Sequence, residues 1–279
     1  MGRQLSVIVP AYNEAERIYL NLAETARALQ ELGLDSEIIA VDDGSTDSTF
    51  AELQRAEREI PQVRAIGYRF NAGKGSALLS GLKFATGELV AFCDCDLDIH
   101  PSQLKSFLVM QREFDADVVN GSKRHPASQV HYSAQRRLLS AGYYFLVRLL
   151  FRLPVRDTQT GLKLFKRSVL EDVARRVLVK RFAFDLELLA VAYHLGYRRI
   201  FEVPVVVHNR RYLGRIRFRD ALVVWLDTLA VFYRLYLRRY YHRVGRAAQA
   251  PSALAPGASN GLPLPLEDQG LSHYQKADS

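Results

Sequence analysis

The chain has 279 residues, 48% of them apolar, and a formal net charge of +8. This is enough for one substantial hydrophobic core, and the length alone does not demand a second domain. The only cysteines, Cys93 and Cys95, are two positions apart in an apolar strand. Adjacent positions of this kind do not suit a disulfide, and without histidine partners they give little support for a zinc site. We therefore expect both thiols to be buried and reduced. No signal peptide is expected at the start.

Apolar runs and helical periodicities alternate through the first hundred residues. We expect strands at 5–10, 37–41, 63–68 and 88–92, and helices at 14–32, 48–59 and from about 75 to 85. Ser45 or Thr46 could cap the second helix. This alternation predicts an α/β fold with a parallel sheet and right-handed crossovers.

Ligands of such sheets bind beyond the carboxyl ends of the strands. Four loops are expected to converge there: 10–14, 42–47, 71–75 and 94–101. The last begins with Asp94 and Asp96, which alternate with the cysteines and are expected to lie side by side. Two such carboxylates suit Mg²⁺ or Mn²⁺ bound to a diphosphate, although the same spacing also occurs in solvated turns.

The positive charge is concentrated in the second half. Residues 123–167 hold ten lysines or arginines and one aspartate, and residues 206–243 hold nine arginines and two aspartates. The rest of the chain is net acidic. Such a split points to an anionic partner, either nucleic acid or a membrane surface.

Two segments of this basic half are rich in leucine and aromatic residues. They cover residues 138–153 and 221–241, and neither reaches the 18 uncharged residues of a spanning helix. Both suit a helix lying among anionic lipid headgroups, and the arginines of residues 214–219 favour this over two core helices. No nucleic-acid-binding motif is visible, so nucleic acid binding is the weaker alternative.

The motifs Pro-Ala-Tyr-Asn-Glu (10–14), Val-Asp-Asp-Gly-Ser-Thr-Asp (41–47), Asn-Ala-Gly-Lys-Gly (71–75) and Asp-Cys-Asp (94–96) occur in one order. In this order they resemble the inverting nucleotide-sugar glycosyltransferases of family 2, which have the GT-A fold. Segments 157–165 and 182–189 look like dolichyl-phosphate glucosyltransferases and polyprenyl-phosphate relatives. The resemblance covers residues 5 to about 240. A catalytically silent sugar-nucleotide module is the remaining alternative.

The resemblance implies a role for each loop. Tyr12 would offer a flat face to the base, and Asp42 or Asp43 would accept hydrogen bonds from base or ribose. Lys74 could reach the diphosphate from its glycine-flanked loop. The nucleotide-sugar contacts implied in this way are Pro10, Tyr12, Glu14, Asp42, Asp43, Lys74 and Asp94. Singly, each of these could equally be a turn residue.

The metal, Mg²⁺ or Mn²⁺, would be held by Asp94 and Asp96, directly or through water, with Asp98 as a third oxygen. Asp98 departs from the family pattern. At this position, mannosyltransferase relatives often have Gln, and glucosyltransferase relatives often have neither Asp nor Gln. The acceptor phosphate would be bound by cations of the second half, namely Lys123, Arg124, Arg136 and Lys163. Asp185 and Glu187 would orient a sugar hydroxyl or an arginine, or act as helix-dipole partners.

These implications define a reaction. A lipid monophosphate is already an anion near neutral pH, so it can attack C1 of the sugar without a strong base. The catalytic set is expected to be Asp94, Asp96, Arg136, Lys163 and Asp185. The expected product is a polyprenyl-phosphate sugar, with UDP-glucose the favoured donor and GDP-mannose or another UDP-hexose the alternative.

The organisation implied is a GT-A catalytic domain at 1–212, which includes an interfacial helix at about 136–153. A juxtamembrane amphipathic region would follow at 213–245. Residues 246–279, rich in Ala, Pro, Gly and Ser, are expected to be disordered and dispensable. The protein is expected at the cytoplasmic face of a membrane, bound peripherally to anionic lipid, without a spanning helix and without nucleic acid as a partner.

Overall fold

The computed structural model describes residues 3–130, 134–179, 183–208 and 218–241. In the helices at residues 134–151 and 218–232, side chains are described only from Ser140 and from Val223 onward, respectively.

The core of the fold is a seven-stranded sheet with the strand order β3-β2-β1-β4-β6-β5-β7. Residues of β1, β2, β4, β5 and β6 are almost all buried, as expected for strands that are covered on both faces. The strands are β1 (Leu5–Ala11), β2 (Ser36–Asp42), β3 (Val63–Gly67), β4 (Leu89–Phe92), β5 (Val118–Ser122), β6 (Lys163–Lys166) and β7 (Ile200–Pro204).

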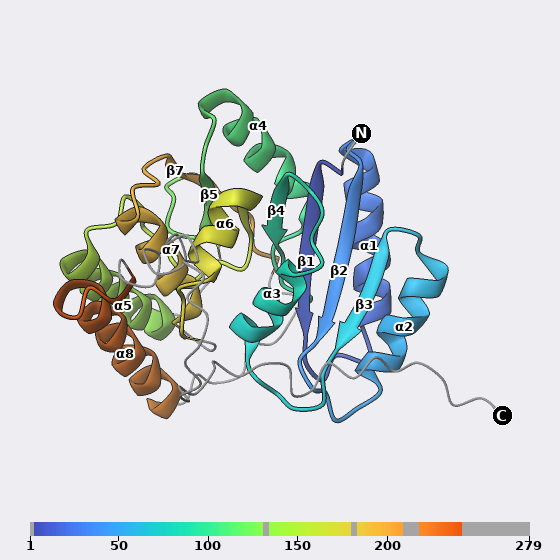
Figure 1. Ribbon diagram of the computed structural model, residues 1–279, viewed down its shortest axis with the longest axis horizontal. Coiled ribbons are helices and arrows are strands. Elements are labelled where there is room, and N and C mark those ends of the chain that lie inside the picture. Colours follow the sequence, from blue (N-terminus) through green and yellow to red (C-terminus); the bar gives the residue numbers. More distant parts are fainter. Residues whose placement is uncertain (1–2, 131–133, 180–182, 209–217, 242–279) are drawn as a thin grey trace, which may run out of the picture.

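Helices cover both faces of the sheet (Figure 1). One face packs on α1 (Ile18–Glu31), α2 (Thr49–Glu59) and α4 (Leu104–Phe114), the last of which follows a short 3-10 turn, η1 (Pro101–Gln103). The other face packs on α3 (Lys74–Leu82), α6 (Arg167–Ala174) and α7 (Phe184–His194). The predicted α/β sandwich is therefore confirmed.

The sheet is mixed, which the alternating pattern of the first hundred residues does not predict. Strand β6 runs antiparallel to both of its neighbours, β4 and β5. Its first residue, Lys163, is paired with Phe92, the last residue of β4. Because β6 begins where β4 ends, the loop that precedes β6 lies at the carboxyl edge of the sheet, beside the expected metal ligands.

Loop contacts correct the predicted start of one helix and the predicted cap of another. Helix α1 begins at Ile18 rather than at Glu14, since the preceding turn is held by the loop after β2. Helix α2 begins after Ser48, and Asp47 accepts a hydrogen bond from the Thr49 backbone N–H at 2.9 Å. Neither Ser45 nor Thr46 is the cap of this helix, which contradicts the prediction.

Helices α5 (Ala134–Phe151) and α8 (Phe218–Phe232) lie side by side at the end of the molecule farthest from β3 (Figure 1). A π-helical turn, η2 (Tyr233–Leu237), continues α8. Val147 and Phe151 of α5, with Val231 and Leu235 of α8 and η2, are buried in the core. Each helix is therefore partly a core helix, and each also carries exposed apolar side chains.

The described part of the chain contains no helix that is both long and apolar enough to cross a membrane. The proposed division at residue 213 and the expected disordered tail at 246–279 fall outside the described residues. Both cysteines are free. Cys93 is buried in the core beside α1 and α4, as expected, whereas Cys95 is only partly buried and packs against that core.

Candidate active site

The loop after β2 is built around two buried carboxylates, Asp42 and Asp43. Asp43 accepts hydrogen bonds from the Tyr68 hydroxyl at 2.5 Å and from the backbone N–H groups of Ala72 and Gly73 at 2.9 and 3.0 Å. It therefore holds the turn that opens α3 and presents Lys74. Asp42 accepts from the Ser45 hydroxyl and backbone N–H.

The loop after β1 is tied to the loop after β2. The Asn13 backbone N–H donates to Ser45 Oγ at 2.9 Å, and the Asn13 side chain accepts from the Thr46 N–H at 2.9 Å. The Glu14 N–H donates to Thr49 Oγ1 at 2.7 Å. Of the nucleotide residues expected here, Pro10 is buried in β1, Glu14 is half-buried, and Tyr12 is exposed.

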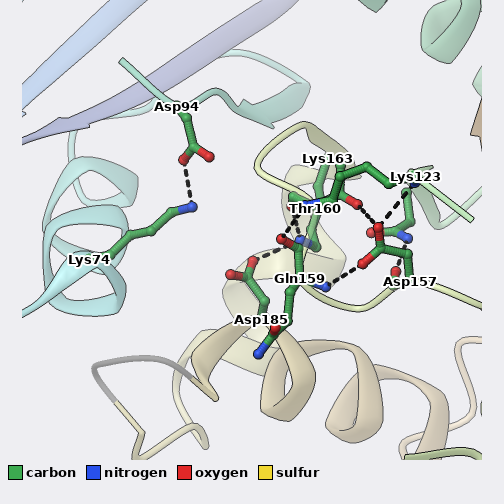
Figure 2. A network of polar contacts seen from close by, with 9 residues as sticks. Lys74, Asp94, Lys123, Asp157, Gln159, Thr160, Lys163 and Asp185 are labelled. Atoms are coloured by element: carbon green, nitrogen blue, oxygen red, sulfur yellow. Dashed lines mark hydrogen bonds and ion pairs between the residues drawn. The ribbon is translucent and has the colours of Figure 1, made fainter. Parts of the chain in front are cut away.

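Asp94 follows β4 and meets a lysine from α3. Lys74 forms an ion pair with Asp94 (Figure 2), with 2.5 Å between Nζ and Oδ1, and 41% of the Asp94 side chain is exposed. Burial of the carboxyl group by itself raises its pKa, but the Lys74 charge and hydrogen bond outweigh this, so the pKa of Asp94 is lowered. Asp94 is therefore a stable carboxylate at the site opening.

Asp96 is less stable as a carboxylate. Burial, together with the charge of Asp94, raises its pKa to about 6, although the Asp98 backbone N–H donates to Asp96 Oδ1 at 3.0 Å. A divalent cation would relieve this repulsion, and carboxylate oxygens are the donors that Mg²⁺ and Mn²⁺ prefer. The donor chemistry of the pair thus fits such an ion.

The expected third metal ligand, Asp98, does not complete a site of three side chains. Among the described residues, no group of three or more His, Cys, Asp or Glu is placed to hold a metal ion. The Asp98 carbonyl accepts from the His208 N–H at 2.8 Å, which ties this loop to the chain after β7. Asp98 therefore stays a predicted ligand only.

The loop before β6 is held by Asp157. Its carboxylate accepts from the backbone N–H groups of Lys123 and Gln159, both at 3.0 Å, and from Thr160 Oγ1 at 2.7 Å (Figure 2). The Asp157 carbonyl accepts from Asn120 Nδ2 at 2.5 Å. These contacts fix the loop to β5, next to Asp94.

The position of Lys163 differs from the expectation. Its side chain is completely buried, and its ammonium group donates to the Thr160 carbonyl and to Asp185 Oδ1, the latter at 2.8 Å (Figure 2). Burial lowers the pKa of Lys163, and the Asp185 charge opposes this. A direct bond to an acceptor phosphate would require Lys163 to give up these contacts.

Of the other cations expected to hold the acceptor phosphate, Lys123 contacts the loop before β6 and Arg124 contacts α5. Lys123 is half-buried, with Nζ 3.4 Å from the Gln159 carbonyl. Arg124 donates to Ser140 Oγ at 2.7 Å, and its guanidinium lies 4.8 Å from the centre of the Tyr144 ring. Arg136 belongs to α5, but its side chain is outside the described residues.

Glu187 does not face this site. Its carboxylate accepts from the backbone N–H groups of Leu178 and Val179 and from the Tyr241 hydroxyl, and Arg234 lies 3.2 Å away. The expected pairing with an arginine is therefore present, but it holds η2 to α7.

Asp157 and Gly161 are site residues to which the sequence reasoning gave no role. Both belong to the segment 157–165 that carries the resemblance, and Asp157 is the single acidic residue among the cations of residues 123–167. An isolated acid in a basic segment is the signal that could have identified Asp157. Its carboxylate pairs with loop N–H groups, which a charge count does not predict.

The chain matches the model of glycosyl transferase family 2 over residues 6–174. It is 32% identical to the dolichyl-phosphate beta-glucosyltransferase ALG5C of Trichomonas vaginalis, over 71% of this chain and 62% of that protein. It is also 32% identical to ALG5A of that organism, over 83% of this chain and 74% of that protein. The glycosyltransferase AglD of Haloferax volcanii is 31% identical, over 85% of this chain and 38% of its own length.

Solved structures share the fold. Glucosyl-3-phosphoglycerate synthase of Mycobacterium tuberculosis, in its complex with UDP, has a TM-score of 0.59 at 20% identity, over 83% of this chain and 79% of that one. A complex of that enzyme with Mn²⁺, UDP-glucose and phosphoglyceric acid has a TM-score of 0.58 at 22% identity, with the same coverage.

The chain is an α/β protein of the GT-A type, with a carboxylate pair and a lysine at the carboxyl edge of its sheet. It belongs to glycosyl transferase family 2. The matched region spans less than two thirds of the length of ALG5C and of AglD.

Proposed function

We propose that this glycosyltransferase transfers a hexose, with inversion, from a nucleotide-diphosphate sugar to a polyprenyl or dolichyl monophosphate. UDP-glucose is the favoured donor. The observation that supports the proposal is the contact of Lys74 with Asp94 at the end of β4, because a cation beside a carboxylate at this edge of the sheet suits a metal-bound diphosphate. The Trichomonas relatives are named dolichyl-phosphate glucosyltransferases, and the mycobacterial enzyme forms complexes with UDP-glucose and Mn²⁺.

Asp94 and Asp96 are proposed to hold Mg²⁺ or Mn²⁺. A cation bound there would neutralise the charge that develops on the departing nucleoside diphosphate. Asp98 is kept as a further ligand, because its loop is adjacent to Asp96. Lys74 would exchange its contact with Asp94 for one with the diphosphate.

The acceptor supplies its own nucleophile. A phosphate monoester is a mono- or dianion near neutral pH, so one of its oxygens forms the bond to C1 while the bond from C1 to the diphosphate oxygen breaks. The protein must therefore bring two anions together, which requires cations that are already in place. Lys123, Arg124 and Arg136 are the proposed contacts of the acceptor phosphate, and Tyr12 with Asp42 those of the nucleoside.

A lipid acceptor is supported by the outer surfaces of α5 and α8. The exposed apolar side chains there form what we call the lipid face: Phe145, Leu149, Val223, Trp225, Leu226, Leu229, Tyr233, Tyr236 and Leu237. Five of them, Val223, Leu226, Leu229, Tyr233 and Leu237, recur every three or four residues, so they lie on one side of α8 and of its continuation η2. The exposed arginines Arg148, Arg152, Arg238 and Arg239 accompany them. Apolar side chains accompanied by arginine suit the headgroup layer of an anionic membrane.

The activity is tested by incubating the purified protein with Mn²⁺, polyprenyl phosphate and radiolabelled UDP-glucose, UDP-galactose or GDP-mannose. We expect label to enter the lipid fraction from UDP-glucose, and the Asp96→Asn variant to lose this activity. Transfer from GDP-mannose alone would make the protein a mannosyltransferase. Absence of transfer from every donor would refute the lipid-phosphate proposal.

The lipid face is tested by co-sedimentation with vesicles of phosphatidylglycerol and phosphatidylcholine. We expect Leu226→Glu/Leu229→Glu to reduce the bound fraction several-fold, because two charges then enter the apolar contact. Val109→Glu, at an exposed position of α4, is the control and should bind as the parent does. Equal binding by both variants, or a shift of DNA in a gel without vesicle binding, would contradict the proposal.

A further inference from the structure

The loop at residues 157–161 is held from both of its ends. At its start, the Asp157 carboxylate accepts from Lys123 N–H, Gln159 N–H and Thr160 Oγ1. At its end, the Thr160 carbonyl accepts from the Lys163 ammonium. A short loop with a buried partner at each end has one favoured conformation.

The ammonium of Lys163 has no access to solvent. It is placed between the Thr160 carbonyl and Asp185, whose carboxylate comes from the first turn of α7. A buried lysine is costly unless its charge is paired and hydrogen-bonded, and here both conditions are met. Through this lysine, the start of α7 is connected to the loop.

Gly161, the next residue of the loop, lies directly against Asp94. A Cβ atom built on Gly161 would be 1.9 Å from Asp94 Oδ2 and 2.4 Å from Asp94 Cγ, far inside any allowed contact. The Asp94 carboxylate therefore lies between the Gly161 backbone on one side and the Lys74 ammonium on the other. Its orientation depends on where the loop places Gly161.

The geometry points to Lys163 as a positioning residue for the metal-binding carboxylate. With Asp185 it forms a strut, defined here as the buried Lys163–Asp185 pair and its bond to the Thr160 carbonyl. The strut sets the position of Gly161 and, through it, the orientation of Asp94 toward Mg²⁺ or Mn²⁺. This inference rests on the proposed function for the metal site and assigns Lys163 a task different from binding the acceptor phosphate.

If the strut orients Asp94, its removal should weaken the binding of Mn²⁺, and this can be measured without following the reaction. Removal of groups that orient a metal ligand costs between about tenfold and a hundredfold in metal affinity. The dissociation constant for Mn²⁺ in the presence of UDP, measured by electron paramagnetic resonance, is therefore the main readout. The full chain is used, and Tm is measured on the same samples.

The critical variant is the double replacement Lys163→Met/Asp185→Leu. Exchange of a buried ion pair for apolar side chains of similar volume is often neutral or stabilising, whereas loss of one partner leaves a buried charge unpaired. We expect Lys163→Met alone to lower both Tm and Mn²⁺ affinity. We expect the double variant to recover Tm but to bind Mn²⁺ at least about tenfold more weakly than the parent, because the Thr160 carbonyl still lacks its donor.

A second variant acts on Asp94 without touching the ion pair. Gly161→Ala inserts a methyl group against the Asp94 carboxylate and should weaken Mn²⁺ binding by a similar factor. Gly142→Ala, on α5, is the matched control, because a Cβ there has no neighbour within 4 Å. Its Mn²⁺ affinity should equal that of the parent.

The outcomes separate this inference from the proposed function. If the parent protein binds no Mn²⁺ with UDP, the metal proposal itself is wrong, and the positioning role is refuted with it. If the parent binds Mn²⁺ and the double variant regains both Tm and parental affinity, the pair is merely structural and the inference is overturned. Parental affinity in Gly161→Ala would overturn it as well.

Discussion

Tyr241 donates a hydrogen bond of 2.5 Å to the completely buried carboxylate of Glu187. Arg234 Nε in turn donates to the Tyr241 hydroxyl at 3.1 Å. The chain after α8 is thus anchored to α7 by a charged cluster that is shielded from water. Since α7 also supplies Asp185, it connects the proposed lipid face with the proposed metal site.

Loss of the Tyr241 hydroxyl should destabilise this anchor. Tyr241→Phe leaves a buried carboxylate oxygen with one donor fewer, which costs about 1–3 kcal/mol in the free energy of unfolding. Urea unfolding monitored by circular dichroism measures the change. Tyr240→Phe is the control, because the Tyr240 ring lies edge-on to Tyr241 while its hydroxyl is not part of the cluster. Equal stability of the two variants would show that the cluster contributes nothing.

Truncation of the chain also tests the contact of Arg234 and Tyr241 with Glu187. A chain that ends at residue 246 retains Arg234 and Tyr241, and we expect it to keep the stability and activity of the full chain. A chain that ends at residue 232 removes both side chains and leaves Glu187 buried without its cation, which should cost about 3–5 kcal/mol. Thermal unfolding distinguishes them. A large loss on removal of residues 247–279 would contradict the expectation that the tail is dispensable.

Glu37 should make the stability of the sheet dependent on pH. Burial by itself raises the pKa of this carboxyl group, but hydrogen bonds from Thr86 and Ser6, with the charge of Arg3, outweigh it and lower the pKa. The unfolded chain therefore binds the proton more readily, so the stabilisation is present at neutral pH and is lost as the pH falls through the folded-state value.

We expect Glu37→Gln to lower the free energy of unfolding by about 1–3 kcal/mol at pH 7. The difference from the parent should shrink as the pH falls below about 4.3, the ordinary value for glutamate. Glu88→Gln, at an exposed carboxylate, is the control and should show no such trend. A difference that is constant between pH 7 and pH 3 would contradict the assignment.

The order of the first four strands and three helices follows directly from the sequence, because each strand is a continuous apolar run that ends in a polar turn. The antiparallel strand β6 does not, since its four residues lie between a basic helix and another short helix and carry no periodicity of their own. Its position depends on pairing with Phe92 and Asn120, far away in the sequence. Long-range pairing of this kind is set by tertiary contacts and leaves no local signal.

The residues of the candidate site also divide into those placed by local sequence signals and those placed by long-range contacts. Asp42, Asp43, Lys74 and Asp94 are placed by loops that directly follow or precede a predicted strand or helix, so their approach to one edge was predictable. The burial of Lys163 was not, because a lysine at the start of a strand is equally compatible with solvent, phosphate or a carboxylate. Its partner Asp185 is 22 residues later, and only the packing of α7 on the sheet brings the two together.

Asp43 should act on the nucleotide site through the turn that it holds. Asp43→Asn places an amide where three groups now donate to a carboxylate, and we expect a loss of about 1–3 kcal/mol in the free energy of unfolding. UDP affinity should fall as well, since the turn presents Lys74. Asp35→Asn, at an exposed aspartate, serves as the control. Unchanged Tm and UDP affinity in Asp43→Asn would refute this role.

Lys74 should contribute to the binding of the donor. Lys74→Met removes a charge-assisted contact of about 1.5–3 kcal/mol, which corresponds to a loss in UDP affinity of about tenfold or more in the presence of Mn²⁺. Isothermal titration calorimetry measures it. The exposed Lys83, just after α3, provides the control Lys83→Met, which should bind UDP as the parent does. Equal affinities for the two variants would place the diphosphate elsewhere.

We propose that a divalent cation and a nucleoside diphosphate bind together where β4 ends. Diffraction from crystals grown with Mn²⁺ and UDP, recorded so that manganese gives an anomalous signal, tests it most directly. We predict one strong anomalous peak within coordination distance of Asp94 or Asp96, next to the two phosphates. A peak and a pyrophosphate group bound away from these two carboxylates would contradict the account.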